Sequence, residues 1–306
     1  MKITVGNAPI SYGAFELTVG IDPNVPDGVG VLDQVASAGY AGIDLGPVGY
    51  LGEGPVLAER LNTRGLGLAG AYLEFPFSDP EALPRLFPEL DAMLDTFDAV
   101  KGRVPGPEPH PTIADAGSDR RRANPGRSHL DPAKWGLDEA GWDRFAAGLS
   151  DVVGRCRARG YEPTFHHETG THVEAPWEIA KVLELSDVQL CLDTGHFFIG
   201  GGDPVAALRE WARRVNHVHL KDAVRDKMTG VIEDNEPTPA IWSREVFCAL
   251  GQGDVDCEGI LHQLEANDFS GWLVVEQDIF PQTSARFAQA IEDQRMNREF
   301  LRTHGL

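Results

Sequence analysis

The sequence has 306 residues, of which 42% are apolar and 24% are charged, a balance that suits a chain with a full buried core and excludes a disordered one. Its length allows either two domains or one large α/β barrel. The 27 lysine and arginine residues against 47 aspartate and glutamate residues give a formal net charge of −20, which argues against nucleic acid or an anionic membrane as a partner.

Short apolar runs alternate along the chain with segments whose apolar residues recur at helical spacing, an order typical of βα units. The predicted strands are 3–5, 42–45, 66–73, 112–114, 164–165, 188–192, 217–220 and 272–275. The predicted helices are 29–38, 55–64, 82–100, 138–159, 176–185, 204–213, 258–267 and 285–303. Eight such units without a linker predict a single (β/α)8 TIM barrel, one domain over residues 1–306, instead of two doubly wound domains.

Two stretches, 101–136 and 224–253, are longer than ordinary loops of a compact domain. Such loops are usually lids or binding loops, and the alternative is a disordered insertion. The second stretch carries Arg225, Lys227, Trp242 and Phe247, a mixture that can contact a polyol and exclude water. We therefore expect it to be a gate over the site.

No apolar stretch approaches the about 20 residues of a membrane span, and the N-terminal residues lack the apolar region of a signal peptide. We expect a soluble cytoplasmic protein with no membrane partner. The cysteines have no paired spacing, which predicts reduced thiols; they are Cys156, Cys191, Cys248 and Cys257.

Metal-binding residue types follow the last four predicted strands, where a barrel of this kind has its active site. The segments are 166–174 (HHETGTHVE), 191–196 (CLDTGH), 217–222 (HVHLKD) and 274–278 (VVEQD). Carboxylates and imidazoles together suit Mn²⁺, Co²⁺, Mg²⁺ or Zn²⁺. His217 and His219 share a strand face, and His219 is nearer the rim, which favours it as the ligand.

Six segments resemble the xylose isomerase-like TIM-barrel superfamily, and within it the inosose dehydratases and the sugar phosphate isomerases/epimerases. They are 41–51, 166–174, 192–196, 216–222, 251–256 and 271–278. The resemblance implies a divalent metal, usually Mn²⁺ or Co²⁺, held by one residue from each of the last four strands. The matching positions are Glu174, Asp193, His219 and Glu276.

The chain departs from the pattern of these relatives at three positions. Dehydratase relatives often have a third histidine where this chain has Glu168, and a glutamate where it has Asp44. Epimerase relatives have their first metal-binding glutamate at the end of the fifth strand, where this chain has His166. Glu168 and His166 therefore remain alternatives to Glu174 as the fifth-strand ligand.

A divalent cation bound to the carbonyl and neighbouring hydroxyl of a ketone acidifies the C–H bond between them, because the resulting enediolate is stabilised. Glu174 and Glu276 are expected to act as ligand and proton-transfer groups together. His196, Lys221 and His166 are candidate acids for a departing hydroxyl, although Lys221 has an alternative as an outward ion pair with Asp222. The remaining candidates, for substrate binding, are Asn7, Tyr12, Tyr72, Glu74, His167 and Arg225.

These residues predict a metal-dependent lyase that dehydrates a 2-keto-polyol such as 2-keto-myo-inositol through an enediolate. The alternative is a metal-dependent sugar or sugar phosphate isomerase/epimerase on the same scaffold. An endonuclease for abasic sites would need a basic groove, which the net charge of −20 argues against. A catalytically silent binding protein would be expected to lack one of the four matched ligands. The expected partner is a small polyol or sugar, and self-association into a homo-oligomer is left open.

Overall fold

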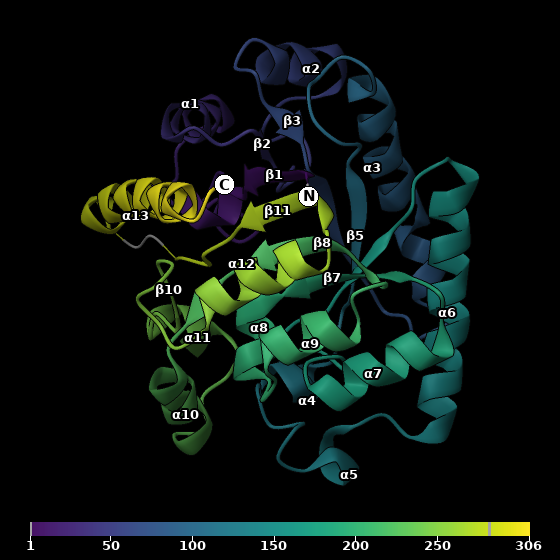
Figure 1. The fold of residues 1–306 in the computed structure, drawn as a ribbon. Coiled ribbons are helices and arrows are strands. Elements are labelled where there is room, and N and C mark those ends of the chain that lie inside the picture. The colour runs from purple at the N-terminus through teal and green to yellow at the C-terminus, as the bar shows by residue number, and fades with distance from the viewer. Residues whose placement is uncertain (1, 281–282) are drawn as a thin grey trace.

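The computed structural model describes residues 2–280 and 283–306, and its strands form a barrel with helices around it (Figure 1). Within these residues, nine parallel strands form one sheet in the order β3-β2-β1-β11-β8-β7-β6-β5-β4. The TIM-barrel prediction is confirmed. The barrel strands are β1 (Lys2–Asn7), β2 (Gly42–Ile43), β3 (Gly67–Leu68), β4 (Gly70–Phe75), β5 (His110–Asp115), β6 (Thr164–His166), β7 (Gln189–Asp193), β8 (Val215–Leu220) and β11 (Ser270–Val275).

The sheet returns on itself at the third predicted strand, which the structure divides into β3 and β4. β3 pairs with β2, and β4 pairs with β5. Ala69 joins the two halves, because its N–H donates to Ile43 O at 2.9 Å and its carbonyl accepts from His110 N at 3.1 Å. One segment therefore pairs with both neighbouring strands and closes the ring.

Trp272 on β11 fills the barrel interior and is fully buried. Glycines on the neighbouring strands leave room for its ring: a Cβ at Gly42 would lie 2.4 Å from the Trp272 ring, and one at Gly67 would lie 2.9 Å from it. Because real Cβ atoms do not approach so closely, these glycines are required by packing.

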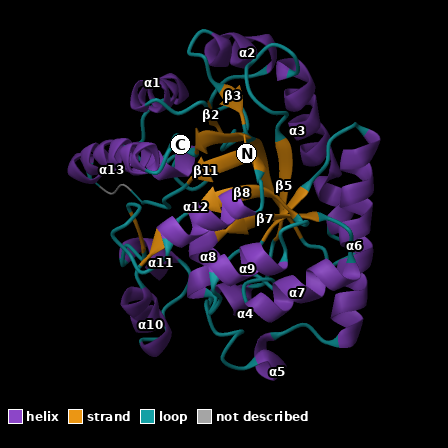
Figure 2. Ribbon diagram, in the orientation of Figure 1, coloured by secondary structure: helices purple, strands orange, loops and turns teal. Residues whose placement is uncertain are grey.

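Helices cover the outside of the barrel (Figure 2). Every helix predicted from the sequence is present within a few residues of its expected bounds. Asp138 shows why one of them begins where it does, since its side chain accepts a hydrogen bond from Gly141 N, three residues into α6. The helices are α1 (Gly28–Ala38), α2 (Gly54–Asn62), α3 (Phe87–Val100), α4 (Asp119–Arg122), α5 (Pro132–Trp135), α6 (Glu139–Ala158), α7 (Pro176–Leu185), α8 (Thr194–Ile199), α9 (Pro204–Glu210), α10 (Arg225–Glu233), α11 (Pro239–Ser243), α12 (Cys257–Ala266) and α13 (Ser284–Thr303), with 3-10 turns η1 (Pro9–Tyr12) and η2 (Leu83–Leu86).

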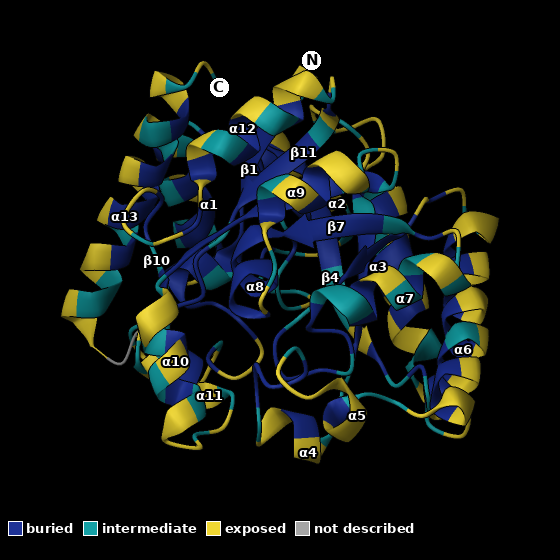
Figure 3. Ribbon diagram, turned by 60° about the horizontal axis from the view of Figure 1, so that its bottom comes forward, coloured by how far each residue is buried: buried dark blue, intermediate teal, exposed yellow. Residues whose placement is uncertain are grey.

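The main hydrophobic core lies between the strands and the inner faces of the helices, and exposed residues lie on the outer faces of the helices (Figure 3). On α3 the buried residues are Leu90, Met93, Leu94, Phe97 and Val100, the i, i+3, i+4 spacing of an amphipathic helix. Burying each such side chain contributes about 1.5–3 kcal/mol. None of the described helices is long and apolar enough to cross a membrane.

Both long stretches are folded, so the disordered-insertion alternative is wrong. The first contains α4 and α5, and the second contains α10, α11 and β10 (Phe247–Cys248). β10 pairs antiparallel with β9 (Asp222–Ala223), which directly follows β8. The buried Asp222 carboxylate accepts hydrogen bonds from the backbone N–H groups of Ala223, Gly251, Gly253 and Val255. The two ends of the second stretch are thereby joined to each other at the barrel rim.

Candidate functional site

Two imidazoles and two carboxylates meet at the carboxyl ends of β6, β7, β8 and β11. They belong to His166, Asp193, His219 and Glu276, and their ligand atoms all lie within 4.8 Å of one another. His166 Nε2 is 3.5 Å from Asp193 Oδ2, and His219 Nδ1 is 2.6 Å from Glu276 Oε2. Each of four consecutive barrel strands thus supplies one side chain.

These four side chains fit a divalent cation. Asp193 Oδ2, Glu276 Oε2, His166 Nδ1 and both ring nitrogens of His219 are buried and have no hydrogen-bond partner of suitable geometry among the described residues. A buried polar atom without a partner costs about 1–3 kcal/mol. Two carboxylate oxygens with two imidazole nitrogens are ligands that Mn²⁺, Co²⁺ and Zn²⁺ accept.

The carboxylates of this group are ionised. Burial opposes ionisation of Glu276, but Lys221 and His219 outweigh burial and lower the pKa of Glu276 to about 2. Burial likewise opposes ionisation of Asp193, whose pKa lies well below its usual value because Lys221 and His196 are close. Two full negative charges therefore face the position that a cation would take.

Lys221 points into the barrel, so its alternative as an outward ion pair with Asp222 is wrong. Its ammonium lies 2.8 Å from Asp278 Oδ1, 3.1 Å from Asp193 Oδ2 and 3.7 Å from Glu276 Oε2. Burial favours the neutral amine, but these carboxylates raise the pKa of Lys221 well above its usual value. The side chain is thus a fixed positive charge beside the four-residue group.

His196 lies on the first turn of α8, directly after β7. Thr169 N donates a hydrogen bond to His196 Nδ1 at 3.3 Å, and His196 Nε2 lies 3.6 Å from Asp278 Oδ2. Burial and Lys221 lower the pKa of His196, but Asp193 and Asp278 outweigh them, and the net shift is upward. His196 is therefore able to hold a proton at the rim.

A cavity of about 560 Å³ opens over this group, a volume typical of small-molecule sites. His166, His196, His219, Lys221 and Glu276 all reach it. Among the other residues along its walls are Asp44, Tyr72, Glu74, Arg122, Glu168, Thr238, Trp242, Asp278 and Phe15.

One wall of the cavity is a carboxyl–phenol–carboxyl arrangement. Tyr72 donates its hydroxyl hydrogen toward Glu168 and toward Glu74 Oε1, the latter at 3.0 Å. One hydrogen cannot serve both acceptors fully. Burial and the Glu168 charge raise the pKa of Glu74 to about 7.

With this geometry established, comparison with known proteins identifies the fold family. A family model described as a xylose isomerase-like TIM barrel matches residues 32–303. This chain belongs to the xylose isomerase-like TIM-barrel family. The resemblance seen in the sequence is confirmed at this level.

The relatives of this xylose isomerase-like barrel include dehydratases and epimerases. The inosose dehydratase of Geobacillus kaustophilus (strain HTA426) is 27% identical over 307 residues, covering 97% of this chain and 93% of the relative. The probable 3-DHS dehydratase AsbF of Bacillus anthracis has the same fold, with a TM-score of 0.69 and 14% identity over 97% of this chain and 98% of that one. The IOLI protein, solved with a zinc atom, gives a TM-score of 0.68 and 15% identity over 96% of both chains. An L-ribulose 3-epimerase gives a TM-score of 0.66 and 15% identity over 98% of this chain and 93% of its own.

Within this xylose isomerase-like barrel, Glu174, the residue expected as the fifth-strand ligand, lies outside the four-residue group. Its Oε2 accepts hydrogen bonds from Gly126 N at 3.0 Å and Gly170 N at 2.7 Å. Its Oε1 accepts one from Ser128 N at 3.0 Å and lies 3.1 Å from Arg121. Three backbone N–H groups and Arg121 thus occupy the Glu174 carboxylate, and the group that could hold a cation contains His166 instead.

Four of the expected substrate contacts lie away from the cavity. Asn7 donates from Nδ2 to Gln294 Oε1 at 3.0 Å, and both Asn7 and Tyr12 are buried behind the barrel rim. His167 is fully buried and accepts a hydrogen bond from Asp193 N at 3.3 Å, so it supports a neighbouring residue of the site. Arg225 is exposed, and its guanidinium stacks on Phe198 at 3.9 Å from the ring centre. Tyr72 and Glu74 do reach the cavity.

Sequence reasoning missed Asp278 as a residue of the site. Asp278 contacts both Lys221 and His196. The spacing of two residues from Glu276 was the available signal, because residues i and i+2 of an extended segment share a face.

The second long stretch meets the cavity only in part. Trp242 forms part of the wall, with its ring centroid 5.6 Å from that of Phe15. The Phe247 ring packs on His196 at 4.9 Å between centroids, and Lys221 lies 4.7 Å from the centre of the same ring. Arg225 and Lys227, the other two residues of the expected gate, lie elsewhere: Lys227 donates from Nζ to Glu245 O at 2.8 Å.

Proposed function

We propose that this protein is a divalent-metal-dependent lyase that removes water from a 2-keto-polyol such as 2-keto-myo-inositol. The observation that carries this proposal is the convergence of His166, Asp193, His219 and Glu276 at the barrel rim, with ligand atoms within 4.8 Å of one another and the protonated Lys221 beside them. Such a site combines metal ligands with a proton source. The dehydratases among the relatives support the same reaction class.

His166, Asp193, His219 and Glu276 would hold the metal, with Mn²⁺ or Co²⁺ favoured over Mg²⁺ or Zn²⁺. When bound, the cation polarises a carbonyl and the neighbouring hydroxyl of the substrate and so weakens the C–H bond between them. The cavity of about 560 Å³ accommodates a six-membered polyol ring. Glu168 and Tyr72, which also line the cavity, are available as partners for hydroxyl groups.

Glu276 is the proposed base. Its ionised carboxylate lines the cavity, and its low pKa keeps it unprotonated at neutral pH until the substrate C–H bond is weakened. The carbon–hydrogen bond breaks, the proton goes to the carboxylate, and the electron pair is delocalised toward the carbonyl.

Lys221 and His196 are the proposed acids for the second half of the reaction. Both reach the cavity and both are held by Asp278, which fixes their orientation. One of them donates a proton to the departing β-hydroxyl as its carbon–oxygen bond breaks, and water leaves. The organic product is a conjugated enol or the diketone to which it tautomerises.

Isomerisation or epimerisation of a sugar is the second candidate function. Glu168 favours it, because this carboxylate lines the same cavity and would provide a second base for returning the proton to carbon. Epimerisation needs no departing hydroxyl, so Lys221 and His196 would then serve only to bind substrate oxygens.

One experiment separates the two reactions. The metal-loaded enzyme is incubated with 2-keto-myo-inositol and with ketoses in deuterated buffer, and products are followed by NMR, mass and ultraviolet absorption. We expect a product lighter by one water with a new ultraviolet chromophore. Turnover that gave only exchanged or epimerised substrate of unchanged composition, with no loss of water, would refute dehydration and support the epimerase.

A further inference from the structure

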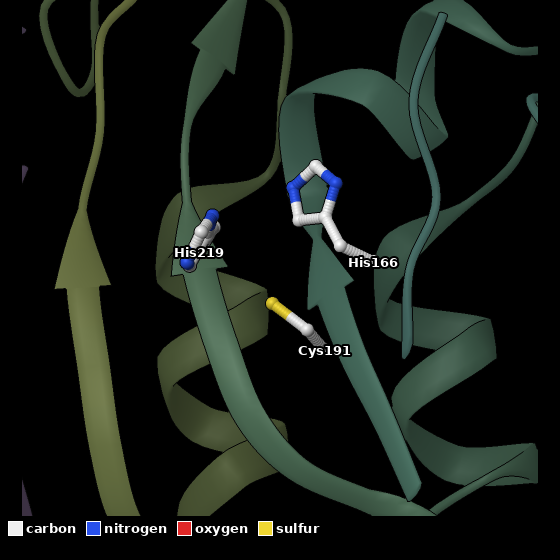
Figure 4. A group of neighbouring side chains, drawn as sticks. All are labelled: His166, Cys191 and His219. Atoms are coloured by element: carbon white, nitrogen blue, oxygen red, sulfur yellow. The ribbon is translucent and has the colours of Figure 1, made fainter. Parts of the chain in front are cut away.

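A thiol lies one layer below the four-residue group. Cys191 precedes Asp193 by two residues on β7, so both side chains face the barrel interior. The register pairs Cys191 with His166 on β6, while Asp193 pairs with His219 on β8. Figure 4 shows the Cys191 sulfur below the two imidazole rings and pointing toward His219.

Cys191, His166 and His219 form a second set of ligand atoms. Cys191 Sγ and one ring nitrogen from each histidine lie within 4.8 Å of one another. Cys191 is fully buried, and the histidines are 4% and 3% exposed. His166 Nδ1 lacks a hydrogen-bond partner among the described residues, whereas the ring nitrogens of His219 lie 2.6 Å from Glu276 Oε2 and 3.4 Å from Asp44 Oδ2.

The chemistry of this set differs from that of the carboxylate-containing group above it. A thiolate with two imidazoles selects thiophilic cations, whereas carboxylates suit harder ones such as Mn²⁺. Zinc binds thiolate sulfur at about 2.3 Å and imidazole nitrogen at about 2.0–2.1 Å. Three ligand atoms within 4.8 Å can meet those lengths with small side-chain adjustments.

We propose that Cys191, His166 and His219 form a second, deeper binding position for a thiophilic divalent cation, Zn²⁺ or Cd²⁺. The cation forms a bond to the Cys191 sulfur, and the thiol proton is released to solvent. The two histidines belong to both positions, so one ion occupies either the deeper or the upper position. The inference concerns metal choice and holds whichever reaction the site catalyses.

Cadmium absorption tests the sulfur ligand directly. The full chain is stripped with a chelator and titrated with CdCl₂, and the ultraviolet sulfur-to-cadmium charge-transfer band is recorded. The wild type should show the band with one equivalent of cadmium. Cys191→Ser should lose it, while Cys156→Ser, a change at an equally buried thiol on α6, should keep it. A band that survives in Cys191→Ser, or none in the wild type, overturns the proposal.

Affinities supply the quantitative form of the same test. Cys191→Ser should lower the ratio of Cd²⁺ to Mn²⁺ affinity at least about tenfold, because only the thiophilic ion uses the sulfur. Cadmium added to manganese-loaded wild type should release one manganese per cadmium bound. If one chain retained both ions, the proposal that the two positions share His166 and His219 would be refuted.

A measurement on the wild type alone covers the case in which Cys191→Ser does not fold. X-ray absorption of the zinc-loaded chain should show one sulfur neighbour at about 2.3 Å. A shell of nitrogen and oxygen only would place zinc in the upper position and refute the deeper one.

Discussion

Replacing Glu174 with glutamine separates a carboxylate that supports the fold from one that serves the site. In the native chain, Glu174 Oε2 accepts from Gly126 N and Gly170 N, and Oε1 accepts from Ser128 N and contacts Arg121. The amide oxygen of glutamine can satisfy one of these pairs. Its NH₂ group then faces two donors, so two hydrogen bonds to a charged acceptor are lost.

The magnitude follows from those two bonds. A hydrogen bond to a charged group contributes about 1.5–3 kcal/mol, and breaking a buried ion pair costs about 3–5 kcal/mol. Arg121 keeps Glu178 as a partner at 2.8 Å, so no unpaired charge remains and the lower part of the range applies. We expect Glu174→Gln to lower the free energy of unfolding by about 3 kcal/mol and the melting temperature by roughly 5 °C.

The assay is guanidinium denaturation of the metal-free chain, because a bound metal would itself add stability. Calorimetric titration with Mn²⁺ at a temperature where the variant is folded then measures metal binding, which should change less than about threefold. Glu184→Gln on the exposed side of α7 is the control for loss of a carboxylate. Wild-type stability together with lost metal binding in Glu174→Gln would refute the reasoning and restore Glu174 as a ligand.

Three further changes test other parts of the site. Glu276→Gln should lower metal affinity and reduce turnover about 10²-fold or more, since it removes a charged ligand and the proposed base. Titration with metal checks the affinity, and kcat with saturating metal checks the turnover. Trp242→Ala should raise KM about tenfold with a smaller effect on kcat, because it removes an apolar cavity wall worth about 1–2 kcal/mol. Glu74→Gln should raise the free energy of unfolding by about 0.5–1 kcal/mol at roughly pH 8, with no effect near pH 4, as measured by denaturation across pH.

The sign of the Glu74 effect follows from proton linkage. The native pKa is raised from 4.5 to about 7, so the native state binds more protons than the unfolded state between those values. Stability contributed by Glu74 is therefore lost as pH rises through this window, and the glutamine variant escapes the loss. If Glu74→Gln were as stable as the wild type at every pH, the placement of Glu74 beside Glu168 would be contradicted. Normal turnover in Glu276→Gln would show that another residue is the base. An unchanged KM in Trp242→Ala would show that Trp242 does not contact the substrate.

The sequence predicted the residues that directly end a strand better than those further along a loop. Asp193, His219 and Glu276 follow from strand ends, because a barrel brings these ends to one rim. After β6 the sequence offers two candidates, Glu168 and Glu174, besides His166 at the strand end, and this loop folds back through a hydrogen bond from Glu168 N to Val173 O at 3.1 Å. That turn directs Glu174 toward the backbone of a distant loop, which no local pattern reveals.

The division of the third strand was also beyond local reasoning. The apolar run over 66–73 is continuous, yet Ala69 changes pairing partner from β2 to β5. Which neighbours a strand has is set by closure of the whole barrel. By contrast, the helices were predictable, because each buries one face and the apolar residues of that face recur in the sequence with a 3.6-residue period.

The contacts of Asp222 hold the 224–253 stretch near both of its ends. One carboxylate holds backbone on both sides of it, and a Cβ at Gly253 would lie 2.3 Å from that carboxylate. Both points of attachment lie at the barrel rim, where β9 also pairs with β10. We expect substitutions or length changes in α10 and α11 to alter the wall around Trp242 while His166, Asp193, His219 and Glu276 on the strands keep their positions. In an engineering experiment, this stretch is the part to exchange between relatives when a new substrate is sought.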